Sequence, residues 1–128
     1  MAGKDGGVTV NGVDFFSNFD SGNLARVEQE ETSSSDLNFT VWTRPDCEGT
    51  EYENGSRSWF YFGMRGAPPG SNVQITVLNL NSLTRLFGQG MQPVWREGQH
   101  GAWSRVGETD HGFKDGQFFI SFQIRFNT

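Results

Sequence analysis

The clearest pattern in the chain is a regular alternation of apolar residues near its C-terminus. Every second position from Phe118 to Phe126 carries phenylalanine or isoleucine, and mostly polar residues lie between them. This period of two predicts a β-strand with one buried face, because successive side chains of a strand point to opposite sides of the sheet. The segments 37–42 and 73–77 alternate in the same way. We therefore predict three half-buried strands of an antiparallel sheet.

Segment 58–64, SWFYFGM, is apolar at nearly every position, which is typical of a central strand that is covered on both faces. Turn signals rich in Gly, Pro, Asn and Asp separate the predicted strands at 53–56, 66–70 and 114–116. Strands at this spacing predict an all-β fold, and we expect an antiparallel β-sandwich in a single domain. One short helical turn is predicted at 81–86.

The length of the chain, 128 residues, is that of one domain. We expect a flexible N-terminal end over residues 1–12 and one β-sandwich domain over residues 13–128. Aromatic residues make up 14% of the chain and include 12 phenylalanines. The core is therefore expected to consist largely of aromatic rings.

Composition and charge narrow the range of partners. The formal net charge is −5, which argues against nucleic acid, because phosphate binding requires clustered Lys and Arg. The chain has no apolar stretch of the roughly 18 residues that a membrane span needs, and its start does not resemble a signal peptide. Cys47 is the single cysteine, which excludes an internal disulfide and suits a reducing compartment. We therefore expect a soluble cytoplasmic monomer that binds neither nucleic acid nor a membrane.

The residues that carry catalytic chemistry are sparse. A catalytic zinc needs three protein ligands and one open position, but neither His100 nor His111 has a second ligand at the usual spacing. Cys47 is expected in a loop rather than as a nucleophile. We therefore expect no catalytic residue, metal or cofactor in this chain. For the acidic residues around Cys47 we favour a solvated loop over an acid and base pair; they are Asp46, Glu48, Glu51 and Glu53.

Three stretches carry a resemblance to a known family: FDSGNL at 19–24, VWTRPDCEGTEYENGSRSWFYF at 41–62 and LFGQGMQPV at 86–94. Together they resemble the N-terminal domain of the cytosolic carboxypeptidases, most closely the type-5 branch, and the resemblance covers residues 13–126. It implies an antiparallel β-sandwich that precedes, and packs on, a separate carboxypeptidase domain that holds a zinc ion. It also implies a cytoplasmic, cytoskeleton-associated parent enzyme that removes glutamates from tubulin tails, including branch-point glutamates.

The zinc ligands and the catalytic glutamate of that family have no counterpart in this chain, which ends at Thr128 just after the last predicted strand. We therefore expect an isolated, non-catalytic N-terminal domain. Its expected partners are the catalytic domain of the same protein and glutamylated tubulin tails, and its expected roles are folding, docking and substrate positioning. The alternative is a cytosolic β-sandwich module that binds protein or carbohydrate, with sugars stacking on Trp42, Trp95 and Trp103.

Within FDSGNL, Ser21 and Gly22 are predicted to form a turn in which Gly22 has a positive φ and Asp20 binds backbone N–H groups. Phe19 and Leu24 are expected to anchor the two sides of this turn in the core. We favour turn geometry as the role of the stretch, with a contact to the catalytic domain as the alternative.

Arginines in the family-like segment are candidates for carboxylate recognition. Arg44 either forms a turn with an internal ion pair to Asp46 or is offered to a partner carboxylate. For Arg44, Arg57 and Arg65 as substrate contacts, we favour the simpler interpretation that they solvate strand ends or pair with acidic residues. The acidic residues concerned are Asp46, Glu48 and Glu51. The loop 87–95 either docks on the catalytic domain or folds back over its own core. The candidate contacts with the catalytic domain or the substrate are Asp20, Arg44, Asp46, Arg57, Met91 and Trp95.

Overall fold

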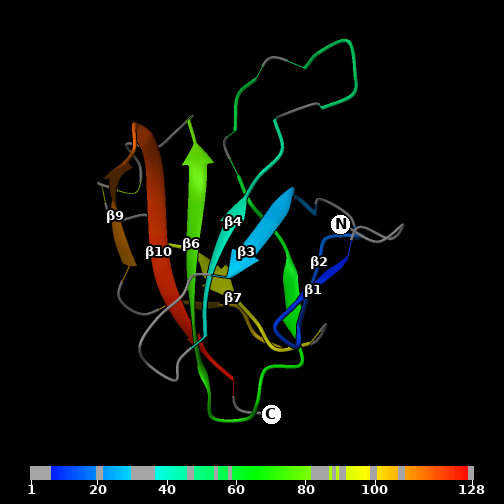
Figure 1. Ribbon diagram of the computed structural model, residues 1–128, viewed down its shortest axis with the longest axis vertical. Coiled ribbons are helices and arrows are strands. Elements are labelled where there is room, and N and C mark those ends of the chain that lie inside the picture. Colours follow the sequence, from blue (N-terminus) through cyan, green and yellow to red (C-terminus); the bar gives the residue numbers. More distant parts are fainter. Residues whose placement is uncertain are drawn as a thin grey trace.

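The computed structural model of the chain consists of β-strands joined by turns and extended connections (Figure 1). Its described residues form ten strands in three sheets, so the predicted all-β class is confirmed. The helical turn predicted at 81–86 falls almost wholly outside these residues. The structure describes residues 7–19, 22–29, 37–45, 48–53, 55–57, 59–81, 87, 89, 92–98, 101–106 and 109–126.

The largest sheet has five strands, and the three strands predicted from alternation form its centre. Segments 37–42, 73–77 and 118–126 correspond to β4, β6 and β10. β6 and β10 pair antiparallel, and their inward side chains, such as Ile75 and Phe122, face the core. In spatial order the sheet contains β3 (Arg26–Gln29), β4 (Leu37–Trp42), β6 (Asn72–Leu80), β10 (Gln117–Arg125) and β9 (Thr109–Lys114).

One pairing in this sheet departs from the antiparallel prediction. β4 and β6 run parallel, with Phe39 opposite Ile75 and Val41 opposite Val77. Between them the chain leaves the sheet, contributes a strand to another sheet and returns to the end at which β4 began. Parallel neighbours require such a crossover, because a tight hairpin can join only antiparallel strands. The sheet is therefore mixed, and the prediction of a wholly antiparallel fold is wrong for this pair.

A three-stranded sheet packs against the five-stranded one, and the two form a β-sandwich. The ring of Phe15 meets that of Phe39 edge-on, with 4.9 Å between ring centroids, and both side chains are fully buried. Figure 1 shows β1 and β2 beside β3, at the opposite side of the molecule from β9. This sheet has the order β1 (Val8–Val10), β2 (Val13–Phe16) and β5 (Gly63–Arg65), and a separate pair is formed by β7 (Val94–Trp95) and β8 (Ser104–Arg105).

Two segments differ from their predicted structure. β1 lies within the end of the chain that we expected to be flexible, so the boundary after residue 12 does not coincide with the start of the sheet. Segment 58–64 is not a central strand, because only its last two residues belong to β5, at the edge of the smaller sheet. Phe60 and Phe62 pack against the core, whereas Tyr61 contacts other aromatic rings outside it. The segment is therefore apolar at alternate positions for two reasons: one set of side chains packs on the core, and Tyr61 packs on aromatic rings outside it.

The core is less dominated by rings than its composition suggested. Phe60 stacks on Phe122 with 6.0 Å between ring centroids, and such rings surround a centre that is mostly aliphatic. β-branched side chains fit the pleated inner faces of the sheets well. The largest fully buried side chains are Phe15, Phe39, Ile75, Leu80, Ile120, Val13, Val41, Val73, Val77 and Thr43.

Candidate functional site

Asn23 joins two of the stretches that carry the family resemblance. Its side chain is 4% exposed, and its backbone N–H donates to the carbonyl of Tyr61 at 2.8 Å. The side-chain Oδ1 accepts from the N–H of Arg44 at 2.8 Å, while Nδ2 donates to the carbonyls of Arg44 at 3.4 Å and Trp59 at 3.2 Å. FDSGNL and the segment 41–62 therefore meet at one buried amide. We did not predict a role for Asn23. The sequence signal for it was an amide side chain directly before the apolar Leu24.

The turn in FDSGNL has a different geometry from the predicted one. Gly22 donates its N–H to the carbonyl of Phe19 at 3.0 Å, but its φ is not in the left-handed region. A Cβ at this position would overlap the carbonyl group of Ser17, so close backbone approach explains the glycine. Leu24 belongs to the core as predicted, whereas Phe19 is half-buried and contacts Phe16 and Tyr61 instead. Asp20 lies outside the described residues.

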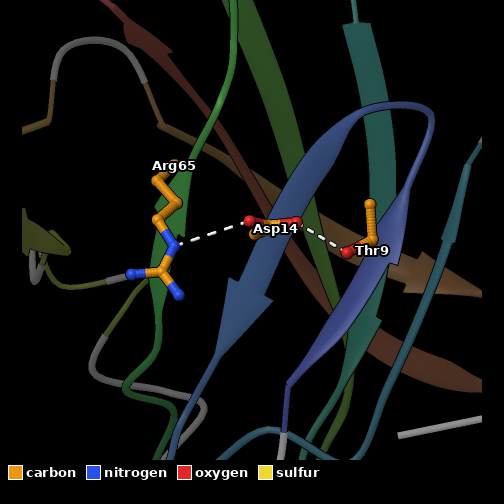
Figure 2. Close-up of polar contacts among 3 residues, drawn as sticks. All are labelled: Thr9, Asp14 and Arg65. Atoms are coloured by element: carbon orange, nitrogen blue, oxygen red, sulfur yellow. Dashed lines mark hydrogen bonds and ion pairs between the residues drawn. The ribbon is translucent and has the colours of Figure 1, made fainter. Parts of the chain in front are cut away.

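Arg65 is already committed to neighbours on its own sheet. Figure 2 shows the carboxylate of Asp14 between Thr9 and Arg65. The Nε of Arg65 lies 3.5 Å from Oδ2 of Asp14, and the hydroxyl of Thr9 donates to Oδ1 at 2.6 Å. The guanidinium also lies over the ring of Phe16, 4.9 Å from its centroid. Arg65 thus has an acidic partner on its own sheet, Asp14, which was not among the predicted partners Asp46, Glu48 and Glu51.

Arg44 has a fixed backbone and an exposed side chain. Its backbone N–H and carbonyl both form hydrogen bonds with the side chain of Asn23, which fixes the backbone orientation of Arg44. No carboxylate of the described residues forms an ion pair with its guanidinium. Asp46 lies outside the described part, so its predicted pairing with Arg44 stays a prediction. Of the acidic residues nearby, Glu53 accepts the N–H of Gly49 at 2.9 Å within an exposed loop, which supports the solvated-loop interpretation.

Arg57 lies in a cavity at another part of the surface. Its N–H donates to Oδ1 of Asn81 at 2.6 Å, and its carbonyl accepts the N–H of Asn81 at 3.0 Å. The cavity measures about 340 Å³ and opens where β6 ends near the β9–β10 hairpin. It is lined by Arg57, Asn79, Leu80, Asn81, Phe113, Gly116, Gln117 and Phe118. The backbone of Arg57 is therefore fixed by Asn81, whereas that of Arg44 is fixed by Asn23.

A line of four aromatic rings, which we call the aromatic row, crosses the surface next to Asn23. Successive ring centroids are separated by 6.0, 4.8 and 6.1 Å. At one end lies Arg65, and at the other Arg96 lies over the last ring at 4.6 Å from its centroid. Trp103, that last ring, is 49% exposed. The row consists of Phe16, Phe19, Tyr61 and Trp103.

The described part of the predicted docking loop 87–95 folds over its own core. Phe87 is buried against Phe118, and Trp95 is half-buried and packs on the core cluster. Val94 is the exposed apolar residue here, with 54% of its surface exposed. Met91 lies outside the described residues. The geometry thus favours the alternative that this loop covers the core.

The described residues contain neither a cluster of metal ligands nor a membrane-spanning helix. No group of three or more His, Cys, Asp or Glu side chains lies close enough within this part to hold a metal ion. None of its helical residues belongs to a helix long and apolar enough to cross a membrane. Cys47 and His100 are outside the described part, and the ring of His111 is tilted against that of Phe118 with 6.2 Å between ring centroids.

Comparison with known proteins identifies the family. The family model of the cytosolic carboxypeptidase N-terminal domain matches residues 15–128. Cytosolic carboxypeptidase-like protein 5 of Rattus norvegicus is 43% identical over 90% of this chain and 16% of its own length. The Danio rerio protein of that name is 43% identical over 92% of the chain and 15% of its own, and cytosolic carboxypeptidase 6 of Caenorhabditis elegans is 31% identical over 72% and 18%. The chain thus spans a small part of these relatives, and it belongs to the family of cytosolic carboxypeptidase N-terminal domains.

Proposed function

We propose that this chain is the non-catalytic N-terminal domain of a zinc metallocarboxypeptidase that removes glutamates from glutamylated proteins such as tubulin. The family match supports this proposal, together with the names of the relatives, which are carboxypeptidases or carboxypeptidase-like proteins. The chain covers 16% of the length of the rat relative. In this proposal the zinc and the catalytic residues belong to a separate carboxypeptidase domain of the parent protein, which acts in the cytoplasm and at the cytoskeleton.

The proposed role of the chain is to dock on that carboxypeptidase domain, and the aromatic row is the observation that carries it. Its rings are half-buried or exposed, and they lie between two arginines. Aromatic residues and arginine are enriched at the centres of protein interfaces, because they bury large areas and form directed polar contacts. Trp103 offers the largest exposed ring of the row. It replaces Trp95 as the leading docking residue, since Trp95 packs on the core.

Docking is tested by measuring the affinity between this chain and the carboxypeptidase domain of the parent protein by calorimetry. Changing Trp103→Glu places a charge on the most exposed ring of the row and is expected to weaken binding about thirtyfold, as loss of a hot-spot residue costs about 2 kcal/mol. Tyr52→Glu is the matched control, because Tyr52 is 71% exposed in the loop 48–53 and has no ring contact with the row among the described residues. Equal affinities for the two variants would reject the assignment of the row as the docking surface.

Arg44 is proposed as a direct contact for an acidic tail of the substrate. Its backbone is fixed by Asn23, and its exposed guanidinium has the geometry to bind a carboxylate with two hydrogen bonds. Because the chain carries a net charge of −5, long-range attraction for an acidic tail is unfavourable, and any contribution must be local.

The test of this contact is the turnover of a glutamylated tubulin-tail peptide by the full-length parent enzyme. Arg44→Ala is expected to raise KM several-fold with little change in kcat, since the lost contact serves binding and not the chemical step. Arg105→Ala removes another exposed arginine, on β8, and is expected to leave both constants unchanged. Unaltered kinetics for Arg44→Ala would leave docking and folding as the roles of this domain.

Among the described residues, the three tryptophans of the carbohydrate-binding alternative do not form a shared stacking surface. Trp42 lies under the guanidinium of Arg26, at 4.5 Å, and Trp103 contacts Tyr61. Trp95 packs on the core cluster. Among the described residues, no ring contact joins any two of these three tryptophans.

A further inference from the structure

β9 is an outermost strand of the five-stranded sheet, and among the described residues no strand pairs with its outer edge. Figure 1 shows β9 at one margin of the molecule, with β10 beside it. The main-chain N–H and C=O groups along such an edge can pair with a further strand. The strand has the sequence TDHGFK, and its residues 110, 111, 113 and 114 are exposed. The edge is therefore accessible along most of its length.

The turn between β9 and β10 determines which residues of β9 direct their backbone groups outward. The two turn residues, 115 and 116, have φ values of 51° and 80°. Such a turn closes on a hydrogen-bonded pair, here Lys114 with Gln117. Hydrogen-bonded and non-hydrogen-bonded pairs alternate along an antiparallel ladder. His111 and Phe113 therefore belong to non-hydrogen-bonded pairs, and their N–H and C=O groups point away from β10.

Two copies of β9 that run in opposite directions are complementary about Gly112. When Gly112 lies opposite Gly112 of the second copy, His111 of each copy lies opposite Phe113 of the other, so the outward backbone groups of both strands meet. Asp110 then lies opposite Lys114 of the second copy, and the two-fold symmetry repeats this pair of opposite charges. A shift of one residue breaks the backbone match, and a shift of two separates Asp110 from Lys114.

The side chains on both faces of β9 leave room for this pairing. Phe113 lies opposite the buried Phe118, so it points to the inner side of the sheet, but 75% of its surface is exposed. The smaller sheet covers the opposite end of the five-stranded sheet (Figure 1). In the paired arrangement the ring of Phe113 meets the imidazole of His111 of the second copy. On the outer face a Cβ at Gly112 would lie 3.2 Å from the ring of Phe119, so this ring flanks the centre of the contact.

In the single chain Asp110 occupies part of the open edge. Its Oδ1 accepts the N–H of His111 at 3.0 Å. Charged side chains on edge strands limit uncontrolled pairing. In the paired arrangement this N–H binds the carbonyl of Phe113 of the second copy, and the carboxylate turns to Lys114 of that copy. Because one hydrogen bond is exchanged for another and only one strand edge is buried, the association is weak.

We propose that the edge of β9 binds a second copy of this chain, so that the two five-stranded sheets join edge to edge in a two-fold symmetric dimer. The net charge of −5 opposes association at long range, and the matched charges at positions 110 and 114 supply the local attraction. The expected dissociation constant is on the order of 100 μM. The dimer stands in place of the monomer expected from the sequence. It depends neither on a parent enzyme nor on docking through the aromatic row.

The first test is sedimentation velocity of the purified chain from about 10 μM to about 1 mM, a range that brackets the expected constant. The average mass is expected to rise towards that of a dimer. Carbodiimide treatment of mixed ¹⁴N- and ¹⁵N-labelled chains is expected to join Lys114 to Asp110 of the other copy. Lys4 is the one other lysine of the chain, so mass spectrometry assigns the link directly. A monomer at every concentration would overturn the proposal.

Charge reversal tests the register. Lys114→Asp and Asp110→Lys alter exposed positions and leave like charges opposite one another, so each variant alone is expected to dimerise at least about tenfold more weakly. An equimolar mixture restores both pairs of opposite charge, and it is expected to form a heterodimer as tight as the parent dimer. Arg125→Asp, at the other end of β10, changes the net charge as Lys114→Asp does and is expected to dimerise as the parent chain does. Unweakened dimers of Lys114→Asp, or a mixture that stays monomeric, would refute pairing through β9.

Discussion

Asn23 illustrates how one side chain can hold together parts of a chain that are distant in sequence. It bonds residues 21 and 36 positions away and is almost completely buried. An amide side chain can donate and accept at once. Asn23 therefore supplies hydrogen-bond partners to the backbone groups of Arg44 and Trp59, which lie outside the strands. Arg44 and Trp59 are thereby positioned relative to the aromatic row.

Asn23→Ala is expected to lower the free energy of unfolding by about 2–3 kcal/mol. The change leaves the N–H and carbonyl of Arg44 and the carbonyl of Trp59 without their partner, and each such group in a part-buried site costs on the order of 1 kcal/mol or more. Urea denaturation of the purified chain measures the loss. Asn18→Ala, at an exposed position, is the control and is expected to change stability by less than about 0.5 kcal/mol. A loss of that small size for Asn23→Ala would show that its hydrogen bonds do not hold the segments together.

At the scale of elements, the turn of the β9–β10 hairpin was predicted correctly because its determinants are local, whereas the strand β9 was not predicted. Asp115 and Gly116 have φ values of 51° and 80°, as a two-residue hairpin turn requires. An Asp-Gly pair between alternating residues is sufficient to indicate this turn. The parallel pairing of β4 with β6 has no such local signature, since it depends on a crossover through the smaller sheet.

Two glycines are required for different reasons, and substitution by alanine distinguishes them. At Gly116 a Cβ would meet nothing within 4 Å. Gly116→Ala is therefore expected to lower the free energy of unfolding only by the cost of a left-handed backbone, about 1–2 kcal/mol. At Gly22 the Cβ would meet the backbone of Ser17, and Gly22→Ala is expected to cost about 3 kcal/mol or to prevent folding. Thermal unfolding of both variants checks the order. A smaller loss for Gly22→Ala than for Gly116→Ala would contradict the close approach at Ser17.

At the scale of the whole molecule, the sandwich has an apolar interior and a polar outer face. On that outer face Gln74 donates to the hydroxyl of Ser121 at 2.7 Å, and Gln123 donates to Gln74 at 3.1 Å. These cross-strand contacts link β6 to β10 on the face that points away from the three-stranded sheet. The potential contact sites, Arg44, the edge of β9 and the aromatic row, therefore lie on loops, strand edges and strand ends around a rigid scaffold.

The purified chain is expected to bind no stoichiometric zinc and to show no peptidase activity, because its sequence lacks a set of three ligands at metal spacing. Elemental analysis after dialysis against a zinc-containing buffer, with release of glutamate from a glutamylated peptide as the second readout, checks both expectations. One tightly held zinc ion per chain would contradict the assignment of the metal to a separate domain.

The sequence by itself determined the all-β class, the strands β4, β6 and β10 and the Asp115-Gly116 turn, since each rests on residues close together in the chain. It also determined the family, which rests on three separate stretches of sequence. Only the tertiary structure decided that β4 and β6 run parallel, that Gly22 is needed for close approach and that Asn23 is the buried junction. It also separated three arginines of similar sequence context: Arg65 pairs with Asp14, Arg44 stays exposed and Arg57 lines a cavity. The physical reason is that local patterns set backbone conformation and buried faces. Which partner a polar side chain finds depends on how distant segments pack around it.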